Sequence, residues 1–133
     1  MNIKREKQLP GGAQAEVFKC RIAGLKGRFV DKTRKVLDNP DIAARTMREM
    51  FSEFMIAKDL IHPSIIEYQY FINTYDQLSK NYEFHIIMEF QEGGDMHDYI
   101  REQGRPKSIE KLKETGGQII SGLKYLHNKK IIH

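Results

Sequence analysis

The chain of 133 residues has little of what secreted and membrane proteins need. It contains one cysteine, Cys20, so it forms no disulfide within itself, which argues against a small secreted scaffold and favours a reducing compartment. Its first ten residues are polar and charged, without the apolar centre of a signal peptide. The longest apolar runs, such as residues 86–88, are far too short to cross a bilayer. The sequence therefore predicts an intracellular, cytoplasmic protein with no membrane partner.

Charged residues are abundant but nowhere concentrated into a tract. The chain has 22 basic and 18 acidic side chains, and its first 50 residues carry 12 of the basic and 6 of the acidic ones. A basic half attracts polyphosphates or nucleic acids. However, the sequence has no run of five like charges, no aromatic and glycine block of the RNA-binding type, and no cysteines and histidines at metal-ligand spacing. We therefore expect no nucleic-acid partner and no metal ligands.

Hydrophobic patterns and turn signals predict three strands, a helix, two further strands, a linker and then two helices. The expected strands are residues 7–9, 16–22, 28–32, 65–72 and 82–88, and the expected helices are residues 40–61, 95–102 and 109–126. Asn39, Asp95 and Ser108 are suited to cap the three helices, and Pro40 suits the first helical position. This order predicts an α+β fold with one antiparallel sheet, a helix packed on it and a helical piece after it.

The first candidate for chemistry is the turn at residues 10–15, which reads Pro-Gly-Gly-Ala-Gln-Ala. Small residues allow backbone N–H groups to approach a phosphate closely, although a plain hairpin turn has the same composition. Lys32 follows Val17 by 15 residues, at the end of the next strand, where its ammonium group can reach phosphates held under the hairpin. Lys35 is a less well spaced alternative, and an exposed strand lysine is the plain interpretation of both.

Two further candidates lie later in the chain. Glu53 lies on the apolar-flanked face of the predicted helix at residues 40–61, where a carboxylate is costly unless it is paired. Glu49, one turn earlier, competes with it for that role. At residues 88–95 a strand opens into an extended segment whose unpaired backbone groups suit a flat heterocycle. The alternative interpretation of this segment is a plain interdomain linker.

The order and spacing of these features resemble the protein kinase family. Glu53 is followed nine residues later by His-Pro-Ser-Ile at residues 62–65, as in the family's helix pattern. Residues 88–95 read Met-Glu-Phe-Gln-Glu-Gly-Gly-Asp, which is similar to the family's Met-Glu-Tyr-x-x-Gly-Gly-Asp. Residues 118–133 are similar to the family's helix E and the strand that enters the catalytic loop. The resemblance covers the chain from about residue 7 to residue 133.

The resemblance implies a known architecture. Residues 1–88 are expected to form the kinase N-lobe, a five-stranded antiparallel sheet plus helix C. Residues 89–94 are expected to form the hinge, and residues 95–133 the start of the C-lobe, with helices D and E. The Gly-Gly-Asp after the hinge and the Leu-His before Asn128 are more similar to Ser/Thr kinases than to Tyr kinases.

By resemblance, ATP is the expected ligand, and a set of positions is expected to bind it. They are Leu9, Gly12, Val17, Val30, Lys32, Glu53, Met88, Glu89, Gln91 and Asp95. Lys32 is expected to hold the α- and β-phosphates beneath the glycine loop, and Glu53 to orient Lys32 through an ion pair. Asp95 is expected near the ribose.

The resemblance also assigns the adenine side of the site. Val17, Val30 and Met88 are expected to line the adenine pocket, with Met88 as the gatekeeper. The backbone carbonyl of Glu89 and the backbone groups of Gln91 are expected to hydrogen-bond the edge of the base.

Two positions depart from the family pattern. Of the loop pattern Gly-x-Gly-x-x-Gly, only the middle glycine, Gly12, is present, and Pro10 takes the first position, where it removes an N–H group. Asp31 stands before Lys32, where an apolar residue is usual. Alternation along the strand predicts that the Asp31 side chain points away from Lys32.

The last departure concerns the end of the resemblance. His133 aligns with the histidine of His-Arg-Asp, so the catalytic aspartate and the metal ligands of the family have no counterpart in this sequence, and no catalytic residue is assigned. Mg²⁺ is accordingly expected only in a complete kinase domain. We expect these 133 residues alone to transfer no phosphate and to expose the apolar face of the last helix. The alternative is a truncated pseudokinase or a regulatory module that binds a protein partner through that helix.

Overall fold

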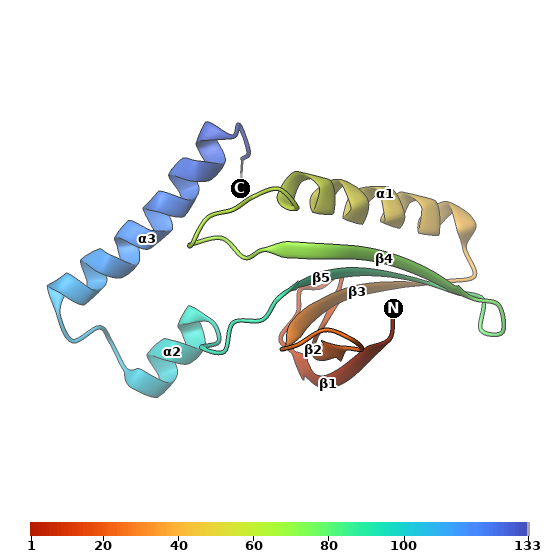
Figure 1. The fold of residues 1–133 in the computed structure, drawn as a ribbon, viewed down its shortest axis with the longest axis horizontal. Coiled ribbons are helices and arrows are strands. Elements are labelled where there is room, and N and C mark those ends of the chain that lie inside the picture. The colour runs from red at the N-terminus through yellow and green to blue at the C-terminus, as the bar shows by residue number, and fades with distance from the viewer. Residues whose placement is uncertain (133) are drawn as a thin grey trace. The chain divides into compact units, whose positions relative to one another are not determined.

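A computed structural model describes residues 1–132 and shows five strands and three helices within them (Figure 1). They are β1 (Ile3–Leu9), β2 (Glu16–Ile22), β3 (Phe29–Leu37), α1 (Pro40–Ala57), β4 (Tyr68–Asp76), β5 (Asn81–Glu89), α2 (Met96–Gln103) and α3 (Ile109–Asn128). The predicted α+β class is confirmed. His133, the expected start of the catalytic loop, lies outside the described residues. The chain divides into two compact units, of which the first contains residues 1–60 and 67–90, and the second residues 61–66 and the chain from residue 91 on.

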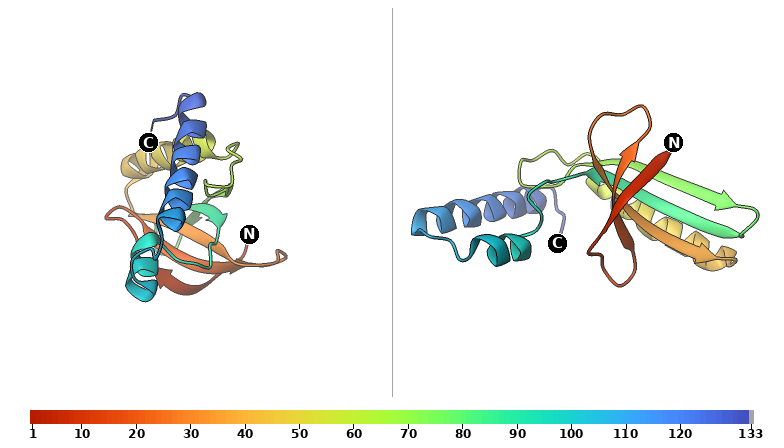
Figure 2. Two further views of the ribbon diagram at one scale, coloured as in Figure 1. Left: turned by 90° about the vertical axis from the view of Figure 1, so that its left-hand side faces the viewer. Right: turned by 90° about the horizontal axis from the view of Figure 1, so that it is seen from below.

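The first unit is built on one five-stranded antiparallel sheet in the order β1-β2-β3-β5-β4. The strands β1 and β2 are steeply rotated relative to β4 and β5, as the second view of Figure 2 shows. Strand β5 is buried on both faces, so the sheet separates two apolar cores. One core, under α1, contains Val36, Ala43, Met50, Phe84 and Ile86. The other, on the opposite face, contains Cys20, Ile22, Phe29 and Ile87.

Several strands are longer than their hydrophobic patterns predict. β1 begins at Ile3 and not at residue 7, β3 continues to Leu37 beyond the predicted end at residue 32, and β4 spans Tyr68–Asp76 in place of residues 65–72. The added segments are mostly polar. They form strands because each is paired in register. For example, Leu37 of β3 and Asp76 of β4 both pair with Asn81 of β5. Ladder pairing satisfies the backbone whatever the side chains are.

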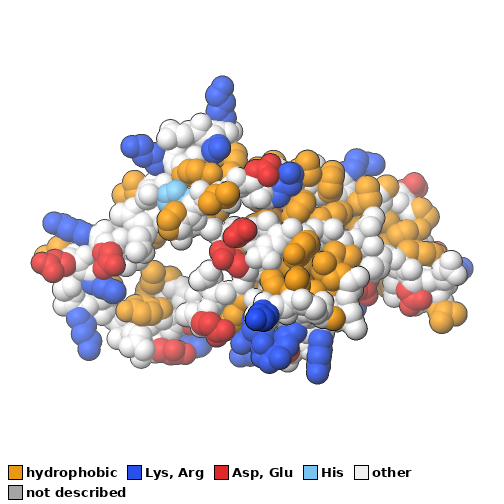
Figure 3. Space-filling model, viewed as in Figure 1, with side chains coloured by type: hydrophobic (Ala, Val, Ile, Leu, Met, Phe, Trp, Pro, Cys, Tyr) orange, Lys and Arg blue, Asp and Glu red, His pale blue; other side chains and the backbone are white. Residues whose placement is uncertain are grey.

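Helix α1 begins where the sequence predicts and ends earlier. The Asn39 side chain accepts a hydrogen bond from the Ile42 N–H, with Pro40 in the first turn. The helix ends at Ala57 and not near residue 61, because the chain turns there and Leu60 N–H donates to the Ala57 carbonyl. Hydrophobic side chains gather over α1 and β4 in Figure 3. The helix itself buries only Ala43, Thr46 and Met50.

A polar cluster lies inside the core on the sheet face opposite α1. Asp31 is fully buried, and its carboxylate oxygens lie 3.1 Å from Arg5, 3.0 Å from His85 Nδ1 and 2.7 Å from the Thr33 hydroxyl, which donates to it. Asp31 thus points away from Lys32, as expected, but into protein and not into solvent. The Arg5 guanidinium also lies 4.1 Å from the centre of the Phe18 ring.

The pKa values of two groups near this cluster are shifted. Burial alone pulls the pKa of Asp31 upward, but hydrogen bonds from His85 and Thr33 and the charge of Arg5 outweigh it, so the net pKa lies below the usual value. Burial, and then the charge of Asp31, raise the pKa of the Cys20 thiol to about 11. Cys20 is therefore a neutral, buried thiol at physiological pH.

In the second unit, α3 packs against the segment at residues 61–66. The Tyr125 hydroxyl accepts a hydrogen bond from the Ile61 N–H at 3.1 Å, and His62 Nε2 lies 3.1 Å from the Ser121 hydroxyl. Because His62 Nδ1 accepts the Ser64 N–H, the neutral ring carries its proton on Nε2, which donates to Ser121. These bonds fix the segment on one face of α3.

A glycine in α3, Gly122, faces this segment closely. A Cβ atom at Gly122 would lie 3.3 Å from the Ser64 Cβ, which is tighter than ordinary contact, whereas Gly116 and Gly117 have open space. As expected, much of the remaining apolar face is exposed; it includes Ile109, Leu112, Ile119 and Ile120. Within residues 1–132, none of the helices combines the length and apolar character that crossing a bilayer requires.

Candidate functional site

The centre of the candidate site is an ion pair between β3 and α1. Lys32 Nζ lies 2.9 Å from Glu53 Oε1 and 3.1 Å from Glu53 Oε2, and both side chains are partly buried. Strand alternation turns Lys32 toward the face that α1 covers, while neighbouring Asp31 faces the opposite core. The structure therefore brings together the lysine and the glutamate that sequence spacing singled out.

Tyr68 holds the glutamate from a third element, a role that the sequence does not predict. Its hydroxyl, at the start of β4, donates a 2.9 Å hydrogen bond to Glu53 Oε1. Burial raises the pKa of Tyr68 far above its usual value, and the charge of Glu53 and this hydrogen bond add to the effect. Tyr68 is thus a permanent donor to Glu53. No sequence signal identifies it, since a tyrosine in a strand is an ordinary β-former.

The competing candidates have other partners. Glu49 Oε2 accepts a 2.8 Å bond from Arg34 Nη1, and this contact, with the charge of Arg34, lowers the pKa of Glu49 despite some opposing desolvation. Lys35 Nζ lies 3.5 Å from Glu83 on β5 and is more exposed than Lys32. Neither Glu49 nor Lys35 takes part in the central pair. Arg34, like Tyr68, was not anticipated.

A small hollow of about 170 Å³ opens beside the Lys32–Glu53 pair. Its lining residues come from the hairpin loop, β3 and α1, and they are Gln14, Ala15, Lys32, Arg34, Glu49, Met50 and Glu53. The loop at residues 10–15 therefore borders the same space as the ammonium group. Its lining includes two basic side chains, each paired with a carboxylate: Lys32 with Glu53, and Arg34 with Glu49.

In the loop itself, the constrained glycine is not the one that the family pattern retains. A Cβ at Gly11 would lie 2.8 Å from the Ala15 carbonyl oxygen, so only glycine fits there without a shift of the loop. At Gly12 nothing lies within 4 Å, so its backbone is open to the surroundings. Gly11 closes the hairpin turn, while the expected contact of Gly12 with phosphate stays a prediction.

The apolar candidates lie on adjoining strands of the first unit. Leu9 pairs with Val17 across β1 and β2, Val17 pairs with Lys32, and Val30 pairs with Met88 across β3 and β5. All four apolar side chains are half-buried. The register therefore places apolar side chains on the strands around Lys32, and their expected contact with adenine stays a prediction.

Three candidates follow at and beyond the end of β5. Glu89 is tied to the segment before β4, because its N–H donates to the Glu67 carbonyl and its carboxylate accepts the Glu67 N–H. Gln91 is exposed in the segment after β5. Asp95 caps α2, accepting a 2.7 Å bond from the Asp98 N–H. Their expected roles beside the base and the ribose stay predictions.

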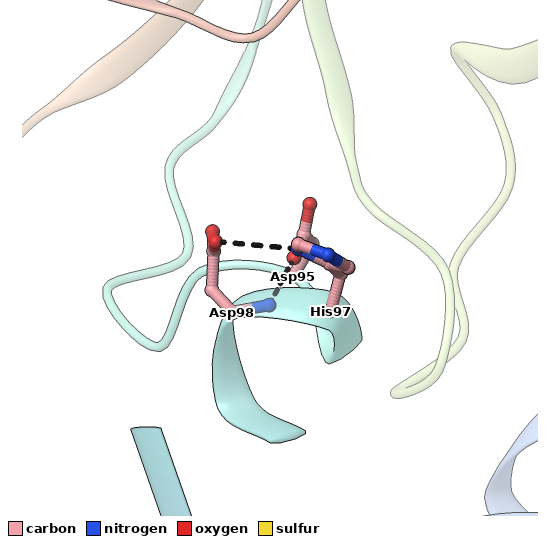
Figure 4. Close-up of side chains that lie close together, drawn as sticks. All are labelled: Asp95, His97 and Asp98. Carbon is pink, nitrogen blue, oxygen red and sulfur yellow. Dashed lines mark hydrogen bonds and ion pairs between the residues drawn. The ribbon is translucent and has the colours of Figure 1, made fainter. Parts of the chain in front are cut away.

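Asp95 also belongs to a group of three side chains, with His97 and Asp98, shown in Figure 4. One ligand atom from each lies within 4.8 Å of the others. Asp95 and His97 are exposed, Asp98 pairs with Arg101 at 3.1 Å, and Asp95 already serves as the helix cap. These interactions account for the group as the start of an ordinary surface helix.

A larger hollow, of about 420 Å³, lies between α1 and the strands β4 and β5. It is lined by Pro40, Ala43, Ala44, Met47, Asn73, Thr74, Tyr75, Tyr82 and Phe84. None of these lining residues is charged, so they include no cation that would pair with a phosphate. The chemistry-bearing residues gather instead in the smaller hollow.

Comparison with known proteins agrees with this geometry. Residues 3–133 match the protein kinase domain family. The chain is 30% identical over 115 residues to the serine/threonine-protein kinase SIK1 of Rattus norvegicus, and 29% identical over the same length to that of Mus musculus. Each alignment covers 84% of this chain and 14% of the relative, so the chain spans about one seventh of the length of these proteins. The chain belongs to the protein kinase domain family.

Proposed function

We propose that this chain is the ATP-binding portion of a Ser/Thr protein kinase domain, which in complete form transfers the γ-phosphate of ATP to protein serine and threonine. The observation that carries the proposal is the Lys32–Glu53 ion pair, at 2.9 Å, beside a hollow bordered by the hairpin loop. The similarity to serine/threonine-protein kinase SIK1 supports the choice of Ser/Thr over Tyr.

Each residue of the pair has a physical role in this proposal. The Lys32 ammonium is a point charge that attracts the α- and β-phosphates, and its partial burial strengthens that attraction relative to water. Glu53 keeps the ammonium aimed into the hollow, and the hydrogen bond from Tyr68 keeps Glu53 in place. Val17, Val30 and Met88 supply apolar surface for adenine, and the backbone of Glu89 and Gln91, with Asp95, stays assigned by resemblance.

Mg²⁺ does not fit the residues described around this hollow. Both carboxylates among its lining residues, Glu49 and Glu53, are already paired with cations. A divalent ion prefers oxygen ligands free to coordinate it. We therefore propose that residues 1–133 tested alone bind ATP but transfer no phosphate, since transfer needs a base and metal ligands that these residues do not supply. An ATP-dependent protein suits an intracellular, cytoplasmic setting, with which the lone buried Cys20 agrees.

The test is thermal unfolding of the chain with and without MgATP. Binding to the folded state alone raises the melting temperature, by several degrees at saturating nucleotide for a domain of this size. We expect the shift in the wild-type chain and in Lys35→Met, because Lys35 pairs with Glu83 and not with Glu53. In Lys32→Met the shift is expected to vanish, while the melting temperature without nucleotide changes little.

Two results would reject the proposal. One is the absence of any MgATP shift in the wild-type chain, which would favour the alternative of a regulatory module that binds a protein partner. The other is an equal shift in the wild-type chain and in Lys32→Met, which would place the nucleotide elsewhere. Radiolabel transfer to a protein substrate by residues 1–133, dependent on Lys32, would contradict the expected inactivity.

A further inference from the structure

A second ion pair between β3 and α1 runs beside the first. Arg34 follows Lys32 by two residues on the same face of β3, and Glu49 precedes Glu53 by one helical turn on α1. Two residues along a strand span about 6.8 Å, and four residues along a helix span about 6 Å. Because these two distances are similar, the two ion pairs can run parallel to each other between β3 and α1. Arg34 Nη1 lies 2.8 Å from Glu49 Oε2, as short as the contact between Lys32 and Glu53.

We propose that Arg34 is a positioning residue for the ATP site, which acts through Glu49 to hold α1 in the register that keeps Glu53 on Lys32. The inference rests on the proposed function, because its consequence is the aim of the Lys32 ammonium at phosphate. It assigns no contact between Arg34 and the nucleotide. Arg34 and Glu49 together are called the second cross-link below.

Few residues of α1 are fully buried, and this gives the second cross-link its importance. Among the 18 residues of α1, only Ala43, Thr46 and Met50 are buried, and Met50 is the one large side chain of the three. One ion pair fixes a helix at one point and leaves rotation about that point open. A second pair, one turn away, restricts this rotation, so Glu53 stays within hydrogen-bond distance of Lys32.

The geometry also explains why Arg34 is suited to this role. Its guanidinium carries several donors in a rigid plane, so it gives direction to the contact as well as charge. The Arg34 side chain is 22% exposed and that of Glu49 is 50% exposed, so the pair is partly screened by water. Arg45, on the helix itself, lies 3.8 Å from the other oxygen of Glu49 and helps to keep this carboxylate charged.

A direct contact of Arg34 with phosphate is the competing explanation, since Arg34 lines the hollow beside Lys32. The two explanations predict opposite changes in ATP affinity for the variant Glu49→Ala. If Arg34 binds phosphate itself, Glu49→Ala frees the guanidinium and strengthens ATP binding. If Arg34 acts through the second cross-link, Glu49→Ala weakens ATP binding about as much as Arg34→Ala does.

The experiment is a double-mutant cycle on the 133-residue chain, read by titration with ATP and, separately, with adenosine. Partly exposed ion pairs contribute little free energy, so we expect each single variant to bind ATP only about two- to fivefold more weakly. The double variant is expected to bind no more weakly than either single one. Arg34→Lys is expected to recover part of the affinity, because it keeps the charge.

Adenosine separates positioning from general damage to the fold. It lacks phosphates, so its affinity is expected to be unchanged in Arg34→Ala and Glu49→Ala. The matched controls are Lys35→Ala and Glu83→Ala, which remove a neighbouring ion pair of β3 that does not involve α1. Stronger ATP binding by Glu49→Ala, additive losses in the double variant, or equal losses for ATP and adenosine would each overturn the proposal.

Failure of the proposed function gives a different pattern. In that case the wild-type chain does not bind ATP, and Lys32→Met changes nothing. The second cross-link is then tested without nucleotide, by measuring the rate of hydrogen exchange of the backbone amides in α1. We expect faster exchange in Arg34→Ala and Glu49→Ala than in Lys35→Ala, and equal exchange in all three would contradict the cross-link itself.

Discussion

Replacing Asp31 by alanine is expected to lower the free energy of unfolding by about 3 kcal/mol, because it removes the acceptor at the centre of a buried polar cluster. Asp31 is fully buried and bonded to Arg5, Thr33 and His85. Without it, the buried His85 and Thr33 lose their shared acceptor, whereas Arg5 is partly exposed and regains water. The measurement is urea unfolding followed by circular dichroism.

The control for this substitution is Asp59→Ala. Asp59 lies at the surface, where it pairs only with the neighbouring Lys58, so the expected change is within about 0.5 kcal/mol. A double replacement of Asp31 and His85 by leucine is expected to recover part of the loss, since it removes both members of a buried pair together. Unfolding of Asp31→Ala at the same urea concentration as the wild-type chain would show that the cluster does not stabilise the fold.

The same cluster makes stability depend on acid pH. The pKa of Asp31 is lowered in the folded chain, so its stabilising contribution is complete above the unfolded value of about 3.9 and is lost as the pH falls through the folded pKa. We expect the difference in unfolding free energy between the wild-type chain and Asp31→Asn to be constant above about pH 5 and to shrink below about pH 4. Urea midpoints between pH 6 and pH 3 measure it, and a difference that grows toward acid would contradict the sign.

The second large effect is expected at Met50. Its side chain is 2% exposed and is the one large side chain that α1 buries in the core under it. Met50→Ala leaves a cavity and is expected to cost about 2–5 kcal/mol. Urea unfolding of Met50→Ala and of Met55→Ala, which changes a methionine on the same helix that is 46% exposed, gives the comparison.

Met55→Ala is expected to change stability far less than Met50→Ala, because nearly half of the Met55 surface is already in solvent. Both variants replace methionine by alanine in the same helix, so the change in helix propensity is the same in each. The difference between their free energies of unfolding therefore reports the packing of α1 on the sheet. Equal stability of the two variants would mean that α1 is not held by this core, and the role given to Met50 would then be wrong.

The three helix starts show what the sequence predicts well. Asn39, Asp95 and Ser108 each cap the helix that the pattern assigned to them, because a cap depends on contacts three residues away. The strand ends show the opposite. The added parts of β3 and β4 are set by pairing with β5, which is distant in sequence and leaves no local pattern.

The candidate site divides in the same way. The pairing of Lys32 with Glu53 follows from a family spacing that the chain retains. The partners Tyr68 and Arg34 depend on how β4 and β3 are placed against α1, and nothing in their local sequence indicates it. The burial of Asp31 was missed for a related reason, since its partner Arg5 lies on a part of β1 that hydrophobic alternation does not predict.

We propose that Lys32 is the lysine that meets the phosphates of ATP. An ATP derivative with an acyl group on its terminal phosphate tests this directly, because a nearby lysine attacks the acyl carbon and retains the acyl group while ATP leaves. Mass spectrometry of peptides then identifies the acylated residue. We expect acylation of Lys32 that excess ATP prevents, whereas excess ATP does not change any acylation of Lys35. Acylation of Lys35 in place of Lys32, or acylation of Lys32 that ATP does not reduce, would contradict it.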